Sequence, residues 1–251
     1  GKLEPVRVRS MVGLIPIFAV EVLDQSVFDT LPAFTGRLHW YLKHRPQLSS
    51  LVPRWTEPGM GERNLLSLLH ADRLQGLLRR MLDETEFLSE FGVRSMSKAH
   101  LESPCKLEFD SMRLEAAYTP GEATTGLFGG NSNWRGPIWM PVNFLLIDAL
   151  RKFHTYFGPD YKVECPVGSG VMMDLNGVAD ELNRRLMKLF VRDADGNRAS
   201  LVRADHARPT TIDDHILFHE YFHGDTGQGL GASHQTGWTG LVANLVARGV
   251  K

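Results

Sequence analysis

Two long segments with helical periodicity constrain the fold of this chain more than any other feature. In residues 143–157, apolar side chains recur at helical spacing and place Leu146, Leu150 and Phe153 on one face. Residues 175–190 carry a longer apolar stripe, and Asp174 stands where an N-cap is expected. Shorter patterns predict further helices over 13–24, 30–44, 70–88 and 236–248. The chain is therefore predicted to be mostly helical, with the apolar faces of its helices packed together.

The segments between the helices predict one small hairpin and two functional loops. Asp195-Gly196 lies between short β-prone runs, which predicts a small β-hairpin near 191–202. Residues 119–137 and 223–237 are long connections rich in glycine and polar residues. Loops of this length inside a domain usually carry function. No low-complexity linker divides the sequence, so residues 1–251 are predicted to belong to a single domain.

Composition and charge exclude several classes of protein. The chain of 251 residues has a formal net charge of -1, so no strong field draws it to nucleic acid or to an anionic membrane. No apolar run approaches the ~18 residues of a membrane span. Cys105 and Cys165 form no C-x-x-C pair, which argues against a disulfide scaffold and favours a reducing, cytoplasmic location. The sequence does not begin with Met, which predicts a fragment or a processed piece.

The stretch "HEYFH" at 219–223 matches the H-E-x-x-H signature of zinc metallohydrolases. His219 and His223 would bind zinc from consecutive turns of one helix, and a third ligand must follow. Gly224 comes directly after the motif and no glutamate occurs after Glu220, although His234 offers a ligand. The sequence thus favours a site without metal. A zinc metallohydrolase stays as one alternative, and ordinary packing histidines beside a loop carboxylate stay as another.

Two blocks of the chain resemble one enzyme family. They are "GLFGGNSNWRGPIWMPVNFLLIDAL" at 126–150 and "FHEYFHGDTGQGLGASHQTGWTGLV" at 218–242. Both resemble glycoside hydrolase family 63, the processing α-glucosidases and their bacterial relatives, and 8–23 and 90–98 resemble further blocks of the bacterial members. The resemblance implies an all-α fold, an (α/α) toroid of the six-hairpin type. This chain then looks like the C-terminal portion of that toroid, and the missing N-terminal part of the same protein is an expected partner.

The resemblance also implies inverting hydrolysis of α-glucosides or related small glycosides. Such enzymes use one carboxyl group to protonate the leaving oxygen and another to activate a water on the opposite face of the sugar. By its position in the family's block, Glu220 is the general base. A base must be ionised near neutral pH, so a polar loop suits it, and His219, His223 and Asp225 are expected to supply that polarity. The general-acid Asp of the family lies upstream of residue 1, whereas Asp213 and Asp214 are predicted to form a helix cap or a turn. The chain alone is therefore expected to be inactive, and an inactive carbohydrate-binding fragment stays as an alternative.

The loop at 131–139 is predicted to form the wall of the sugar site. Trp134 and Trp139 offer flat apolar faces to the C–H side of a pyranose ring. The sugar hydroxyls are expected to be bound by polar groups of both blocks: Asn133, Arg135, the backbone N–H groups near Gly136, and Gln235. The alternative is that both tryptophans pack the core and that Arg135 holds a structural carboxylate. No cofactor is expected, the sugar and its linkage stay open, and helix faces without neighbours predict self-association.

Overall fold

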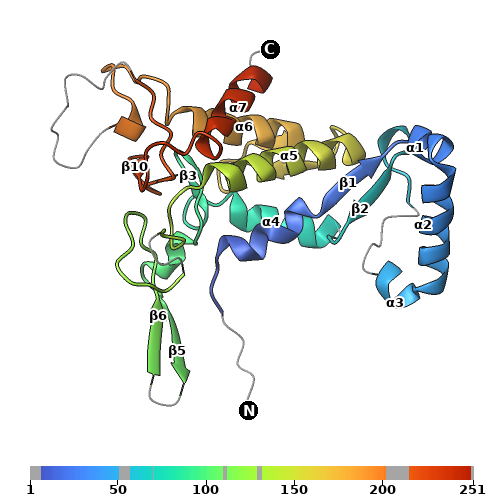
Figure 1. The fold of residues 1–251 in the computed structure, drawn as a ribbon, viewed down its shortest axis with the longest axis horizontal. Coiled ribbons are helices and arrows are strands. Elements are labelled where there is room, and N and C mark those ends of the chain that lie inside the picture. Colours follow the sequence, from blue (N-terminus) through green and yellow to red (C-terminus); the bar gives the residue numbers. More distant parts are fainter. Residues whose placement is uncertain are drawn as a thin grey trace.

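A layer of helices forms the body of the molecule. The computed structural model describes residues 7–50, 57–69, 71–109, 112–128, 132–201 and 215–249, so the predicted turn at Asp213 and Asp214 lies outside the described residues. The main helices of the body are α4 (Ala71–Met81), α5 (Met140–Phe157), α6 (Leu175–Met187) and α7 (Val242–Gly249). In Figure 1, α5 and α6 lie side by side across the middle, and α7 packs against α6.

The two long predicted helices are confirmed, and their apolar faces form the core. Leu146, Leu150 and Phe153 of α5 are completely buried, together with the apolar stripe of α6. Asp174 caps α6 as predicted, because its Oδ1 accepts a hydrogen bond of 2.7 Å from the N–H of Gly177. Burial of these faces is the main source of stability for helices of this length.

Short antiparallel hairpins and 3-10 helices connect the long helices. The hairpins pair β1 (Val20–Leu23) with β2 (Asn64–Ser67), β3 (Leu88–Ser89) with β4 (Gly92–Val93), β5 (Cys105–Phe109) with β6 (Met112–Ala116), β7 (Lys162–Glu164) with β8 (Met172–Asp174), and β9 (Tyr221–Phe222) with β10 (Gly229–Leu230). The 3-10 helices are η1 (Met11–Phe18), η2 (Met60–Glu62), η3 (Lys98–His100), η4 (Ala199–Leu201) and η5 (Thr239–Leu241). Both β3 and β10 lie near the N-terminal end of α5 (Figure 1).

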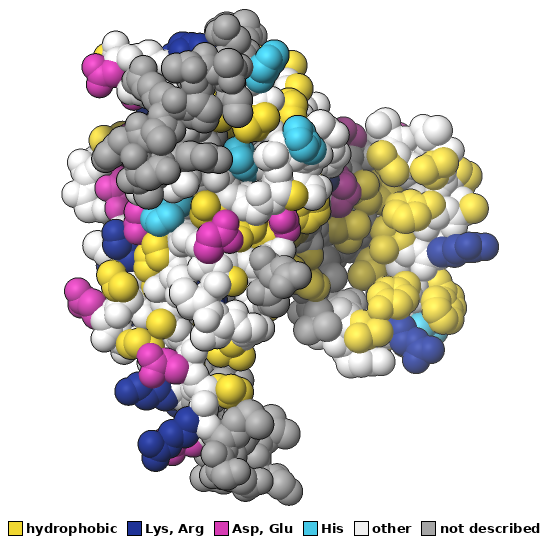
Figure 2. Space-filling model, turned by 60° about the vertical axis from the view of Figure 1, so that its left-hand side comes forward, with side chains coloured by type: hydrophobic (Ala, Val, Ile, Leu, Met, Phe, Trp, Pro, Cys, Tyr) yellow, Lys and Arg dark blue, Asp and Glu magenta, His cyan; other side chains and the backbone are white. Residues whose placement is uncertain are grey.

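A helical lobe, residues 25–49, projects from this body. It consists of α1 (Gln25–Thr30), α2 (Pro32–His44) and α3 (Pro46–Ser49), which contain no buried residue. The hairpin of β1 and β2 joins the lobe to α5. Figure 2 shows hydrophobic side chains gathered on the lobe, and the exposed apolar residues there are Leu31, Phe34, Trp40, Tyr41 and Leu48.

The predicted hairpin near 191–202 is wrong. Residues 191–201, the described part of that range, contain no strand. The turn at Asp195-Gly196 does form, because the Asp193 carboxylate accepts hydrogen bonds from the N–H groups of Asp195 and Asn197. The chain then enters η4 instead of a second strand, because a side-chain turn of this kind satisfies its own backbone donors without a partner strand.

One predicted helix is shorter than the periodicity suggested, and another does not form as an α-helix. The helix expected over 70–88 ends at Met81, because Asp83 binds the N–H and hydroxyl of Thr85 and starts a turn that leads into β3. The segment 13–24 forms η1 and then β1 instead of an α-helix. In both places a local turn or a strand partner outweighs helical propensity.

The helix-rich fold agrees with the all-α prediction, but the described helices do not close a ring. Antiparallel hairpins occupy the ends of the helical layer (Figure 1). Closure of an (α/α) toroid therefore stays a prediction. None of the described helices is long and apolar enough to cross a membrane. Cys105 and Cys165 are both free thiols.

Candidate active site

The two long loops meet at the N-terminal end of α5. Ile138, just before that helix, pairs with Phe222 of β9 through two backbone hydrogen bonds of 2.8 and 3.0 Å. Gly224 donates a backbone hydrogen bond of 2.9 Å to the carbonyl of Pro120. The segment that carries Glu220 is thereby held against the loop that carries Trp134.

The stretch "HEYFH" is extended, not helical. Four residues of extended chain span about 13 Å, so His219 and His223 cannot face one metal as they would from consecutive helical turns. The ring of His219 covers Gly229, where an added Cβ would lie 2.1 Å from it. The Nδ1 of His223 instead accepts the N–H of Asp225 at 3.1 Å. The zinc alternative therefore lacks the helix that its signature requires.

Burial of the two histidines keeps them neutral near pH 7. Burial lowers the pKa of His219, and the nearby His234 lowers it further. Burial also lowers the pKa of His223, against the opposing charge of Asp225. Two neutral rings thus flank Glu220 along the chain, and the polar setting predicted for this carboxylate does not include a cationic imidazole.

Glu220 faces the loop that contains Trp134. Its Oε1 accepts a hydrogen bond of 2.5 Å from the hydroxyl of Ser132, and its Oε2 lies 3.4 Å from the N–H of Ala232. The indole N–H of Trp238 donates to the backbone carbonyl of Glu220 at 3.1 Å. Both carboxylate oxygens act as acceptors in this arrangement, which suits a group that takes a proton from water.

An aromatic cluster lies beside this carboxylate. Trp134 stacks on Trp139 with ring centroids 3.9 Å apart and planes 5° from parallel. Trp139 stacks in turn on Tyr221 at 5.0 Å, and Trp238 meets its edge at 6.1 Å. Trp139 is only 2% exposed, whereas Trp238 is 36% exposed and Trp134 is half-buried. Trp139 therefore supports the cluster from within, and Trp134 and Trp238 offer the accessible ring surface.

Asn133 and Arg135 use their hydrogen bonds within the protein. The amide of Asn133 donates to the carbonyls of Thr119 and Gly121 at 2.6 and 2.7 Å. Arg135 is 2% exposed and donates to the hydroxyls of Thr124 and Thr125 and to the carbonyl of Leu127. These two side chains fold the loop that faces Glu220. Their predicted contact with sugar hydroxyls stays a prediction.

The buried Arg135 pairs with no carboxylate among the described residues. Burial lowers its pKa, and its Nε has no hydrogen-bond partner in the described part of the chain. Among the described residues, Arg135 therefore does not hold a structural carboxylate, as one alternative had expected. Its role is to hold hydroxyl and carbonyl oxygens of residues 124–127.

Gly136 allows the two loops to touch. Its φ of 143° favours glycine, and an added Cβ would lie 2.6 Å from the ring of Tyr118. A Cβ on Gly224 would lie 2.4 Å from the carbonyl oxygen of Gly136. The N–H of Gly136 donates to the hydroxyl of Ser95 at 2.9 Å, so this predicted sugar donor is occupied in the structure.

Gln235 precedes the turn at 236–238 that leads into η5. Its carbonyl accepts the N–H groups of Trp238 and Thr239 at 3.0 and 2.8 Å, and its own N–H donates to Phe218. Its half-buried side chain makes no hydrogen bond with the described residues. It therefore remains available as the predicted sugar ligand.

The sequence did not indicate Glu122, Arg94, Lys98 or Tyr118 as residues of this site, and it indicated Asp225 only as a polar neighbour of Glu220. Asp225 accepts from Arg94 at 2.9 Å, from Tyr118 at 3.1 Å and from Lys98 at 3.3 Å. Glu122 accepts the hydroxyl of Tyr221 at 2.7 Å. The only sequence signal for Asp225 and Glu122 is that each lies in one of the two long polar loops. Their partners lie about a hundred residues away in sequence.

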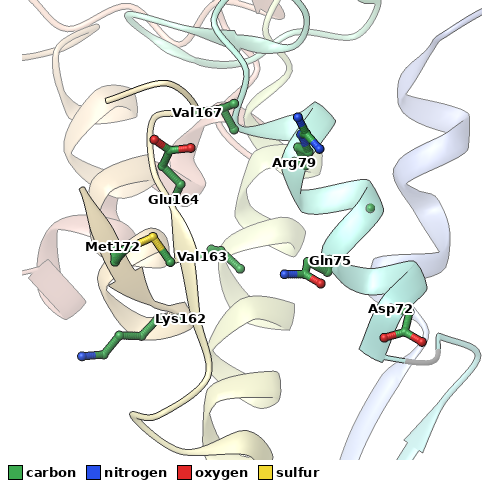
Figure 3. A pocket seen from close by; sticks show the side chains of 9 residues that line it. Asp72, Gln75, Arg79, Lys162, Val163, Glu164, Val167 and Met172 are labelled. Atoms are coloured by element: carbon green, nitrogen blue, oxygen red, sulfur yellow. The ribbon is translucent and has the colours of Figure 1, made fainter. Parts of the chain in front are cut away.

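A separate open groove lies on another part of the body. Figure 3 shows it between α4 and the hairpin of β7 and β8, with Arg79, Lys162 and Glu164 at its rim. Its volume is about 480 Å³. None of the residues around Glu220 lines it, so this groove is not the site described above.

The chain is similar to known proteins over most of its length. Residues 64–239 match the mannosylglycerate hydrolase MGH1-like glycoside hydrolase domain. An uncharacterized protein of Saccharomyces cerevisiae is 47% identical over 96% of this chain and 22% of its own length. A mannosyl-oligosaccharide glucosidase of the same yeast is 30% identical over 71% of this chain and 16% of its own length. A probable mannosyl-oligosaccharide glucosidase of Schizosaccharomyces pombe is 28% identical over 73% of this chain.

Two features of these relatives bear on the earlier predictions. All three are yeast proteins, so they do not support the expected likeness to bacterial members in particular. The chain spans between 16% and 22% of the length of these relatives. All the residues of the site around Glu220 lie within the matched range, residues 64–239.

Proposed function

Because this chain belongs to the family of mannosylglycerate hydrolase MGH1-like glycoside hydrolase domains, we propose that it supplies the general base of an inverting glycoside hydrolase. Its substrates are α-glucosides or related small glycosides, since two of the similar proteins are named mannosyl-oligosaccharide glucosidases. The whole protein carries out the reaction, and this chain contributes Glu220 and the aromatic wall beside it.

The position of Glu220 carries this proposal. Its carboxylate is half-buried, bonds to Ser132 of the facing loop and lies beside an aromatic cluster. Aromatic faces and hydrogen-bonding carboxylates are the groups that bind and transform pyranose rings. A carboxylate that served only to hold the loop would not need the stacked tryptophans next to it.

In the proposed reaction, Glu220 removes a proton from a water that attacks the anomeric carbon. The hydroxyl of Ser132 and the N–H of Ala232 orient its two oxygens during this transfer. A carboxylic acid on the opposite face of the sugar protonates the leaving oxygen, ~6.5–9.5 Å away. By the family resemblance this acid is an Asp, and we propose that it lies upstream of residue 1 in the full-length protein.

Replacement of Glu220 in the full-length protein tests the base assignment. We expect Glu220→Gln to lower kcat about 10²–10⁴-fold with little change in sugar binding, because an amide cannot take the proton. Glu90→Gln is a matched control, since Glu90 is exposed and, among the described residues, forms an ion pair only with Lys188. Near-normal turnover by Glu220→Gln would reject the assignment.

The stereochemistry of the product tests inversion separately. Proton NMR of the first product anomer from an α-glucoside should show the β-anomer, and an initial α-anomer would contradict the inverting mechanism. We also expect this chain on its own to show no hydrolysis. Turnover by the isolated chain would place both carboxyl groups within it.

A further inference from the structure

A second carboxylate lies next to Glu220. Glu122 is an exposed residue of the loop that precedes Trp134. Its Oε2 accepts a hydrogen bond of 2.7 Å from the hydroxyl of Tyr221, the residue that follows Glu220 in the chain. The proposed reaction does not use Glu122, and its exposure leaves it accessible to a ligand.

Both carboxylates flank one backbone turn. The Oε1 of Glu122 lies 3.5 Å from the N–H of Gly231, and the Oε2 of Glu220 lies 3.4 Å from the next N–H, that of Ala232. A Cβ on Gly231 would lie 2.8 Å from the Oε2 of Glu220. The missing side chain at this position therefore leaves the space between the two acids open.

Tyr221 fixes the position of Glu122. Its side chain is completely buried and stacks on Trp139 at 5.0 Å, so its hydroxyl has little freedom. Burial, and then the hydrogen bond and charge of Glu122, raise the pKa of Tyr221 well above its usual range. The phenol thus stays a hydrogen-bond donor at every working pH. One oxygen of Glu122 is anchored by Tyr221, and the other accepts only the long hydrogen bond of 3.5 Å from Gly231. A carboxylate oxygen has two lone pairs, so this second oxygen can also accept from a ligand.

The charge around the pair indicates what such a ligand would offer. No Lys or Arg of the described residues forms an ion pair with Glu122 or Glu220, whereas Asp225 nearby pairs with both Arg94 and Lys98. A carboxylate without a cationic partner is best satisfied by neutral hydrogen-bond donors. Sugar hydroxyls are such donors, and an ionised carboxylate can accept about four hydrogen bonds.

We propose that Glu122 accepts hydrogen bonds from hydroxyls of the sugar bound beside Glu220, and that Tyr221 is the positioning residue that holds its carboxylate. This inference rests on the proposed function, because it names a sugar contact at that same site. Glu122 then contributes to the choice of sugar, since a ring that lacks the matching hydroxyl leaves the carboxylate unsatisfied.

Binding to the full-length protein in a Glu220→Gln background tests the contact without turnover. The probes are methyl α-D-glucopyranoside and its 2-, 3-, 4- and 6-deoxy analogues, titrated by NMR. We expect the further change Glu122→Gln to weaken glucoside binding on the order of 10–100-fold. One deoxy analogue should bind Glu122→Gln and its parent almost equally well, because it lacks the hydroxyl that Glu122 accepts. Glu102→Gln, at an exposed turn, is the control and should bind as the parent does.

The positioning role of Tyr221 is tested by a double-mutant cycle. Tyr221→Phe should weaken binding less than Glu122→Gln, and adding it to Glu122→Gln should weaken binding no further, because both act through one contact. Effects that multiply would show that Tyr221 and Glu122 act on binding independently, and would overturn the positioning role. Equal affinity of Glu122→Gln and its parent for every probe overturns the role of Glu122 and leaves the proposed function intact. If the parent binds none of these glucosides, the proposed function and this inference both fail.

Discussion

At the scale of single residues, the site depends on a position that only glycine can occupy without strain. Gly231 has a φ of 66° and sits against both Glu220 and the ring of Tyr221. An alanine there would adopt an unfavourable backbone conformation and push against the carboxylate. The geometry of the base is therefore set by an absent side chain as much as by the hydrogen bonds that hold it.

Gly231→Ala should reduce activity more than stability. We expect a loss of about 1–2 kcal/mol in the free energy of unfolding, from the left-handed backbone, and a fall in kcat/KM of about 10²-fold from the displaced carboxylate. Gly240→Ala is the control, because a Cβ at Gly240 meets no atom within 4 Å. Urea denaturation and steady-state kinetics on both variants measure the difference. Equal activity of the two variants would contradict the tight fit at Gly231.

Asp225 should make the stability of the protein depend on pH in the acid range. Burial alone would raise the pKa of Asp225, but the hydrogen bond and charge of Arg94, with Lys98 and Tyr118, hold it below its ordinary value of 3.8. Its contribution to stability is thus complete above pH ~4 and is lost as the pH falls through the lowered pKa.

Asp225→Asn should therefore destabilise the protein at pH 7 by on the order of 2–3 kcal/mol, because it leaves the buried Arg94 without its partner. The difference from the wild type should shrink as the pH falls below about 4. Urea midpoints of both proteins across pH 3–7 test this. Asp180→Asn, which breaks an exposed pair with Arg151, should change stability little at any pH. A constant difference for Asp225→Asn would exclude the ion pair as its cause.

At the scale of elements, one buried amide ties α5 to the hairpin of β3 and β4. Asn143 is completely buried, and its side chain accepts from the N–H of Val93 at 2.7 Å and donates to its carbonyl at 3.0 Å. The side chain thus pairs with both backbone groups of Val93, as a neighbouring strand would. This contact holds the N-terminal end of α5, where the two loops meet, against the hairpin of β3 and β4.

Asn143→Leu should cost about 3 kcal/mol or more, since it leaves the N–H and the carbonyl of Val93 buried without partners. The matched change Asn183→Leu should cost about 1 kcal/mol, because the side chain of Asn183 makes a single hydrogen bond within the described part of the chain, to the carbonyl of Leu245. Thermal and urea unfolding of both variants test this order of effects. A larger loss for Asn183→Leu would contradict the special role of Asn143.

The long helices could be predicted from the sequence, because their apolar periodicity matches the face they bury. The end of α4 at Met81 and the failed hairpin after Val191 could not, because aspartate side chains decide both turns through short-range hydrogen bonds. The resemblance brought Glu220 and Trp134 to one site. It could not show that the amide of Asn133 donates to the backbone of its own loop, because the hydrogen-bond partners of a loop residue depend on the three-dimensional structure.

At the scale of the whole molecule, the helical lobe of residues 25–49 has no core of its own among the described residues. None of its residues is buried, and helices this short are marginal without packing. Since the chain spans at most 22% of the length of its relatives, we expect the apolar face of the lobe to pack against further protein in the full-length molecule.

The chain on its own should therefore self-associate through this lobe. Phe34 and Tyr41 lie two helical turns apart on α2 and are 41% and 42% exposed. Replacing both with glutamine should shift the sedimentation profile toward monomer, because it removes apolar surface from the contact. The control replaces Leu145 and Val246, which are exposed to a similar degree on α5 and α7, and should leave the profile unchanged. A monomeric wild-type chain would contradict the proposal.

The contacts that hold the acidic residues of the site also order its assembly in time. Ser132 and Glu220 are 88 residues apart in sequence, Glu122 and Tyr221 are 99 apart, and Arg94 and Asp225 are 131 apart. Contacts this distant form late, after local helices have closed. During synthesis on a ribosome, the helical layer can begin to fold before the segment that carries Glu220 has been translated. In refolding, we expect far-ultraviolet ellipticity to recover before the emission of the stacked indoles, and simultaneous recovery would argue against this sequence of events.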